Sequence, residues 1–250
     1  MAMTVTEAFR KHVDSVDRLM NFDRDVLEFA IQAIGDLQTR LVQHHELQNP
    51  HLTAGRTLEI LKGYRAHDSL RPRYKTIFNQ ALVLLVSYFG ASVHDVFRKG
   101  IAAELQRDSD STLLREQFRL SFRDLKDYDF QLRDVAPDLL VQAKDISFQD
   151  MQSIYRAFKE YLDIRIERDQ TVNEIIVAQG CRHVIVHAGG AVSDRLLRQI
   201  SGATPRTLKR DLIAGDLVEF SVDEVSSVAN SMISYLERLE AQVETKIAHG

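Results

Sequence analysis

Apolar residues recur at intervals of three and four along most of this chain, which is the spacing of one face of an α-helix. Residues 6–48 show the pattern first, until Asn49 and Pro50 interrupt it. Residues 53–64 repeat it over a shorter length. The pattern therefore predicts a helical N-terminal segment over residues 1–70.

The most apolar helix of the chain is expected to begin at Pro72, because a proline in the first turn removes an N–H that has no partner there. Its apolar face runs from Ile77 to about Leu105. Gly90 and Gly100 lie inside it, as points where the helix bends or a neighbour approaches closely. A helix this apolar is expected at the centre of a core.

Three later segments also favour helix. Residues 112–133 carry dense alternating charge, which is typical of the solvated face of a helix. Ser147 with Asp150 resembles a capping box that opens the next helix, and Ser221 with Glu224 is a clear capping box before the last one.

Residues 170–188 predict a helix followed by Gly189, the residue type that most readily takes the left-handed conformation of a helix C-cap. Residues 184–186 are β-branched and favour strand, and Gly180 weakens a helix. The apolar spacing that starts at Val172 continues through them, so we interpret the segment as one helix.

Only 11 Gly and 4 Pro occur in 250 residues, which leaves little chain for turns and favours long helices over many short strands. The fold class predicted from the sequence is all-α, a helical bundle with long core helices. Residues 1–70 are expected as an N-terminal helical extension and residues 71–250 as the main helical domain. No long linker separates them, so we expect one compact unit.

Charge and cysteine content narrow the functional classes. The formal net charge of -4 gives no global field that attracts nucleic acid, so any such contact must be local. A single cysteine, Cys181, excludes an internal disulfide framework and a cysteine-rich zinc site. The sequence shows no signal-like apolar stretch at its start, and its longest apolar run is far shorter than the ~20 residues of a membrane span. We therefore expect a cytoplasmic protein with no membrane contact.

The segment from Gly180 to Gly190 carries the candidate chemistry. Arg182 is always a cation, and its donors suit a phosphate group. His187 can exchange a proton near neutral pH. On an ideal helix, five residues separate the two side chains by roughly 140° around the axis and about 7.5 Å along it. They would meet at one phosphate only if the helix frays or a second copy of the chain completes the site, which favours a dimeric cleft.

Each of these candidate residues also has an interpretation in which it serves only the fold. His183 and His187 are four residues apart, which is a metal-ligand spacing, but no third ligand is evident and we expect no metal and no cofactor. His183 could instead pack on the surface, and His187 could be favoured by the helix C-terminus. Cys181 fits a small core residue better than a nucleophile. Gly189 fits a helix cap better than a phosphate loop.

A local run of cations follows the motif, and no acidic residue interrupts it. It is the best candidate for a surface that binds the phosphates of RNA, although its members could equally form ion pairs with acidic helices. The run consists of Arg195, Arg198, Arg206, Lys209 and Arg210.

The stretch from Arg182 to His187 resembles the signature of the HEPN superfamily, which is an arginine, a usually polar residue, and a histidine after four to six intervening positions. Residues 79–86 are similar to the first core helix of that family. The segment from Gly215 into the last helix is similar to the end of its RiboL-PSP-type members. The resemblance covers about residues 72–245.

The resemblance implies a bundle that dimerises with two motifs facing one cleft. Many members are metal-independent endoribonucleases that act as toxins or antiviral effectors. It implies that Arg182 binds the scissile phosphate, that His187 transfers a proton and that His183 orients the phosphate. The implied partners are RNA, a second copy of the chain and a cognate antitoxin or defence protein.

Some members of the family are inactive modules that bind RNA or a partner protein, and this alternative stays open. The early core helix of the family often carries an acidic residue near the position of Gly90. The nearest acid here is Asp95, more than one helical turn later.

Overall fold

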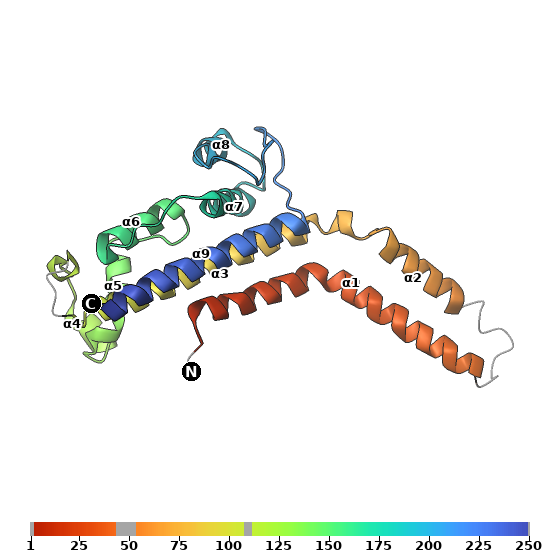
Figure 1. Ribbon diagram of the computed structural model, residues 1–250, viewed down its shortest axis with the longest axis horizontal. Helices are drawn as coiled ribbons and strands as arrows, with labels where there is room; N and C mark the ends of the chain where they lie inside the picture. Colours follow the sequence, from red (N-terminus) through yellow and green to blue (C-terminus); the bar gives the residue numbers. More distant parts are fainter. Residues whose placement is uncertain (1–2, 44–53, 108–111, 250) are drawn as a thin grey trace.

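The computed structural model describes residues 3–43, 54–107 and 112–249, and nearly all of its regular structure is helical (Figure 1). Among these residues the one pairing of strand type is an isolated bridge between Ala191 and Leu217. The predicted all-α class is confirmed. In chain order the helices are α1 (Val5–Gln43), α2 (Arg56–Ala66), η2 (Arg71–Arg73), α3 (Lys75–Glu104), η3 (Thr112–Arg115), α4 (Phe122–Asp127), α5 (Leu132–Ala143), α6 (Met151–Leu162), α7 (Gln170–His187), α8 (Asp194–Ile200) and α9 (Val222–His249).

Helices α3 and α9 lie side by side at the centre of the molecule and run in the same direction (Figure 1). At their first ends, the Asn79 side chain donates to the Val218 carbonyl at 2.8 Å. Near their last ends, the Lys99 ammonium contacts Glu244 at 2.8 Å. Helices α1 and α7 contact this pair and run antiparallel to it, which gives a four-helix arrangement.

Helix α3 supplies the centre of the core, as its apolar sequence predicts. Its fully buried Phe89 packs edge-on against Phe9 of α1 and Tyr235 of α9, with ring centroids 6.2 and 5.5 Å apart. Its buried Phe97 packs in the same way against Phe158 of α6, at 5.3 Å. By length and composition alone α3 also qualifies as a membrane-crossing helix, yet 50% of its most apolar stretch is buried in the bundle.

Both glycines inside α3 admit close neighbours. A Cβ added at Gly100 would lie 2.7 Å from Leu162, and one added at Gly90 would lie 3.0 Å from the Phe148 carbonyl oxygen. The first distance is shorter than real Cβ contacts and the second is tighter than most of them, so each glycine lets another segment approach the helix backbone.

The first half of α1 belongs to the bundle. Phe9, Val16 and Met20 are buried in the common core. The buried carboxylate of Glu240, on α9, accepts hydrogen bonds from the backbone N–H groups of Val5 and Thr6 at 3.0 and 3.1 Å. A residue from another helix therefore satisfies N–H groups that a helix start leaves without partners.

The second half of α1 and helix α2 project from the bundle as an arm (Figure 1). Of the side chains described between residues 24 and 77, none is buried. Arg71 fixes the root of this arm, because its guanidinium donates to the Met20 carbonyl at 2.8 Å and lies 3.6 Å from the buried carboxylate of Asp23. The predicted N-terminal extension thus comprises a core segment and an exposed arm.

Some predicted boundaries differ from the structure. Pro72 lies in η2, before the start of α3. Residues 112–133 do not form one charged helix, because only η3, α4 and the start of α5 are helical there. The N-cap of α6 is Asp150 and not Ser147. The Ser221 capping box of α9 is confirmed by its reciprocal hydrogen bonds with Glu224.

We predict that Glu240→Ala lowers the free energy of unfolding by about 2 kcal/mol, because it leaves the buried donors of Val5 and Thr6 without their charged acceptor. Urea unfolding of the wild type and the variant measures the change. Glu244→Ala is the matched control, because Glu244 lies on the same helix and its side chain is 53% exposed. Equal losses in both variants would contradict the role of Glu240.

Candidate functional site

Helix α7 carries the Arg182–His187 motif and has defined ends. The Asp169 side chain accepts from the Val172 N–H at its start. At its end, the N–H groups of Ala188 and Gly190 both donate to the Val184 carbonyl, at 2.9 and 3.1 Å. The helix ends at His187 and its C-cap is Ala188, so the predicted cap at Gly189 is wrong by one residue; Gly189 follows the cap with φ of +60°.

A buried carboxylate attaches α7 to α9. Glu174 accepts hydrogen bonds from the hydroxyls of Ser231, Thr207 and Ser227, at 2.6, 2.7 and 3.2 Å. Burial alone would raise the pKa of Glu174, but these hydrogen bonds outweigh burial and hold the pKa below its ordinary value of 4.5. The charged form of Glu174 therefore holds the motif helix in the folded protein.

Helix α8 packs directly on α7 at Gly180. A Cβ at that position would lie 2.9 Å from Leu196 and 3.1 Å from Ile200, both buried residues of α8. The glycine that weakens the helix in the sequence is therefore the point at which a second helix reaches its backbone. This contact brings the side chains of α8 beside Arg182.

The segment between α7 and α9, which contains α8, has its two ends joined by hydrogen bonds next to the motif. The Val218 N–H donates to the Gly190 carbonyl at 2.9 Å, and the Val192 N–H donates to the Asp216 carbonyl at 2.8 Å. Ala191 and Leu217 form the isolated bridge between these bonds. Helix α8 is thus held over α7 from both sides of its loop.

Arg182 lines a groove of about 620 Å³ between α7, α8 and the start of α6. His183, Arg195 and Arg198 line the same groove. The structure therefore brings four of the residues singled out in the sequence around one concave surface. Within the part of the chain that the structure describes, the Arg182 Nε is buried and has no hydrogen-bond partner.

The rings of the two motif histidines lie in tilted contact on the exposed side of α7. The rings of His183 and His187 lie 4.8 Å apart, as their spacing of four residues predicts. Burial lowers the pKa of His183, and the neighbouring His187, Arg195 and Arg182 lower it further. This lowering favours the neutral form of His183. His187 does not line the groove. Its ring contacts the ring of His183, which does line it.

Cys181 is a core residue. Its side chain is fully buried, and burial raises the pKa of its thiol to about 12, so it carries no thiolate for nucleophilic attack. In the described residues, no three His, Cys, Asp or Glu side chains gather closely enough to hold a metal ion.

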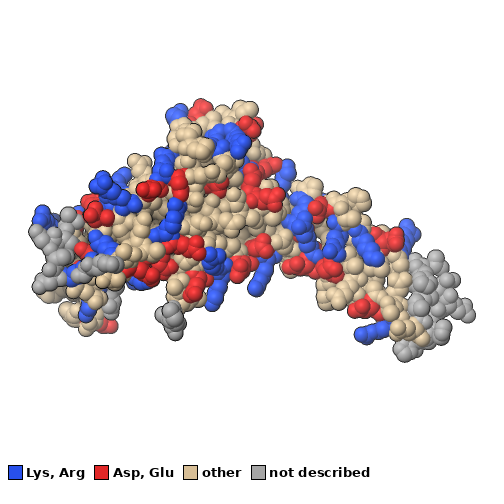
Figure 2. All heavy atoms as spheres, viewed as in Figure 1, with Lys and Arg blue, Asp and Glu red and all other residues tan. Residues whose placement is uncertain are grey.

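The basic run divides into two parts. Arg195 and Arg198 are exposed beside the groove. Lys209 is instead 11% exposed, contacts the Glu224 carboxylate at 2.5 Å and lies over the Phe220 ring. The Arg206 guanidinium donates to the Arg210 carbonyl. Only the first part adjoins Arg182, and Figure 2 shows acidic and basic side chains interspersed over the rest of the visible face.

The resemblance leads one to look for an acidic residue on α3, but the acidic residue that lines the groove is on another segment. Asp95 is exposed on that helix, and Gly90 packs against the segment before α6. Asp150, the N-cap of α6, lines the groove together with Arg182. Its role as an N-cap is readable in the sequence, but its position opposite α7 depends on the packing of α6.

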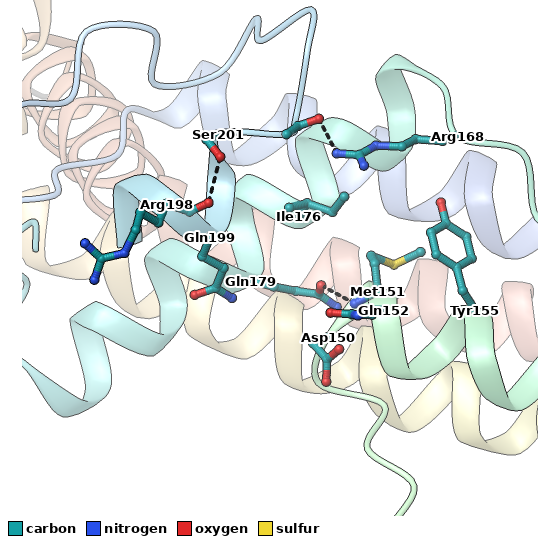
Figure 3. A pocket seen from close by; sticks show the side chains of 11 residues that line it. Asp150, Met151, Gln152, Tyr155, Arg168, Ile176, Gln179, Arg198, Gln199 and Ser201 are labelled. Atoms are coloured by element: carbon teal, nitrogen blue, oxygen red, sulfur yellow. Dashed lines mark hydrogen bonds between the residues drawn. The ribbon is translucent and has the colours of Figure 1, made fainter. Parts of the chain in front are cut away.

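A second cavity of about 530 Å³ adjoins the groove and shares Gln179 and Arg198 with it (Figure 3). The apolar side chains of Ile176 and Met151 line it together with several polar ones. Sequence reasoning did not identify this cavity. The one signal available was Gln179, a polar residue on an apolar helix one turn before Arg182.

Comparisons with protein-family models, with curated proteins and with solved structures found no match to this chain.

We predict that Glu174→Gln destabilises the protein at pH 7 and that the difference from the wild type shrinks on acidification. The lowered pKa of Glu174 means that its stabilising charge is fully present above about pH 4.5 and is lost as the pH falls through the folded-state pKa. Urea unfolding at several pH values between 7 and 3 measures the difference. A difference that stays constant, or grows in acid, would contradict the assignment.

Proposed function

We propose that this chain is a HEPN-like endoribonuclease that cleaves RNA without a metal ion. One observation carries the proposal: Arg182, His183, Arg195 and Arg198 line one groove, and the ring of His187 contacts that of His183. Three guanidinium groups in a protein of net charge -4 make this groove a local site for phosphate.

In the proposed reaction the ribose 2′-oxygen attacks the phosphorus and loses its proton to a base. The bond to the 5′-oxygen breaks, and that oxygen gains a proton. The products are a 2′,3′-cyclic phosphate and a 5′-hydroxyl. Arg182, which lines the groove, stabilises the charge that builds on the phosphate oxygens.

The histidines would handle the protons of this reaction. His187 is exposed and is the proposed proton-transfer group. The pKa of His183 is lowered beside two arginines, which favours its neutral form, and its N–H can donate a hydrogen bond to the phosphate without adding charge. Neutral imidazole also serves as a base, which makes His183 a second contributor to proton transfer.

A second copy of the chain fits this proposal. His187 does not line the groove of its own subunit, so a partner that places its own His187 there would complete the site. Exposed Val186 and Leu217 offer apolar surface beside the histidines for such a contact. A cognate antitoxin or defence protein is a further expectation from the resemblance, and a cytoplasmic location is an expectation from the sequence.

A helical module that binds RNA or a protein partner without cleavage is the second candidate function. It is favoured by the absence, among the described residues of α3, of an acid that lines the groove with Arg182. Binding of RNA with no cleavage in any assay would support this candidate.

We predict that Arg182→Ala and His187→Ala each lower RNA cleavage by about 100-fold or more, because each removes a group that acts only in the transition state. Cleavage of RNA in EDTA by the purified proteins measures this. Arg40→Ala and His67→Ala are matched controls on the exposed arm and should keep full activity. Undiminished cleavage by either motif variant would refute the proposed roles.

Mixing the two inactive variants tests how the site is shared. If Arg182 of one subunit acts with His187 of the other, a mixed dimer contains one intact site and regains part of the activity. If both groups come from one subunit, every site in the mixture lacks one of them and activity stays absent.

We predict that Arg198→Ala weakens RNA binding and lowers the dependence of log affinity on log salt by roughly 0.7, the contribution of one phosphate contact on a single strand. Arg198 is exposed in the groove, so its removal should leave stability unchanged. Lys209→Ala should lower stability and leave RNA binding and its salt dependence unchanged, because Lys209 forms an ion pair with Glu224. Fluorescence titrations at several salt concentrations, with urea unfolding, separate the two outcomes.

A further inference from the structure

We propose that the second cavity, between α6, α7 and α8, is a nucleobase subsite that selects a keto base, guanine or uracil. The inference rests on the proposed function, because it assigns the cavity to the nucleotide whose phosphate binds at Arg182.

Position is the first argument. Gln179 lines both the cavity and the phosphate groove, so the two spaces are continuous along α7. Gln179 and Ile176 precede Arg182 by three and six residues, which is roughly 4.5 and 9 Å along the helix axis. One nucleotide spans this distance. A phosphate at Arg182 therefore leaves its own base beside Ile176.

The lining is the second argument. Ligand sites combine apolar walls with a few fixed polar groups. Ile176 and Met151 provide apolar surface on which a base can lie (Figure 3). The amides of Gln152 and Gln199 reach toward the same space from α6 and α8. A volume of about 530 Å³ is ample for a base and its ribose.

The decisive group is the Gln179 amide. Its carbonyl oxygen accepts from the Met151 backbone N–H at 3.0 Å, which fixes the orientation of the amide (Figure 3). The Nε2 group is then the remaining donor of a residue that lines the cavity. The Gln179 side chain is only 5% exposed, and among the described residues its Nε2 has no partner. A buried donor without an acceptor is costly, so this amide favours a ligand that brings one.

Keto bases provide that acceptor. Guanine carries O6 and uracil carries O4, whereas adenine and cytosine carry amino donors at the corresponding positions. A donor fixed at Gln179 would therefore face a second donor in adenine or cytosine. The Tyr155 hydroxyl is a further buried group without a partner in the described chain. Burial raises its pKa to about 12, so it stays protonated and donates at neutral pH.

The test is direct binding of the four nucleoside 3′-monophosphates to the full-length protein by calorimetry. We expect guanosine or uridine 3′-monophosphate to bind about tenfold more tightly than the adenosine and cytidine compounds. Equal binding of all four, or no saturable binding, would overturn the inference.

Gln179→Glu sharpens the test because it keeps the oxygen that accepts from Met151 and replaces the free donor with an acceptor. We expect the preference to reverse toward adenosine or cytidine. Gln142→Glu is the matched control, since it adds the same charge at an exposed position of α5, outside the cavity. It should keep the wild-type preference. A reversal in both variants would assign the effect to charge and overturn the inference.

Ile176→Phe covers the case in which Gln179→Glu does not fold. It fills the cavity from a half-buried position and should weaken nucleotide binding at least tenfold. The outcomes separate the two proposals. Keto-selective binding without RNA cleavage supports the subsite and rejects the nuclease. Cleavage that Arg182→Ala abolishes but that shows no base preference, and is unaffected by Ile176→Phe, supports the nuclease and rejects the subsite.

Discussion

The close approach of α8 to the backbone of α7 at Gly180 is the contact on which the candidate site depends. Leu196 and Ile200 occupy the space where any other residue would place its Cβ. Because these two side chains point down onto α7, Arg195 and Arg198 on the same short helix point outward beside Arg182.

The bundle gives that contact a rigid base. Glu174 holds α7 to α9 through three hydroxyl groups, two of them from α9 itself. Lys209 holds the segment after α8 to Glu224 at the start of α9. Both interactions bury charge beside compensating partners, which makes the placement of α8 costly to change. The groove is therefore preorganised, as electrostatic stabilisation of a transition state requires.

Much of the fold could be predicted from the sequence because its signals are local. Helix spacing, the Ser221 capping box and Gly189 at the end of α7 all depend on neighbours within one or two turns. The same reasoning failed over residues 112–133. Alternating charge there suited a helix, but Asp129 and Phe130 take positive φ values of 48° and 57° and end it.

The site itself was predictable only in part. The sequence identified Arg182 and the histidines, since their chemistry is evident from residue type and spacing. It gave equal weight to all five downstream cations, although Lys209 is bound to Glu224 and Arg198 is exposed in the groove. That division depends on which acidic residues fold close by. The Gln179 cavity was not predicted at all, because it forms only where three helices meet.

The charge of the protein bears on how it could distinguish one RNA from another. Phosphate contacts supply affinity without sequence information, and their strength falls steeply with salt. Only Arg182, Arg195 and Arg198 line the groove as cations, and the chain around them has a net charge of -4. For the proposed function, three such contacts supply a salt-sensitive affinity that carries no base preference. The proposed selectivity would then rest on uncharged groups next to the phosphate position, such as the fixed amide of Gln179.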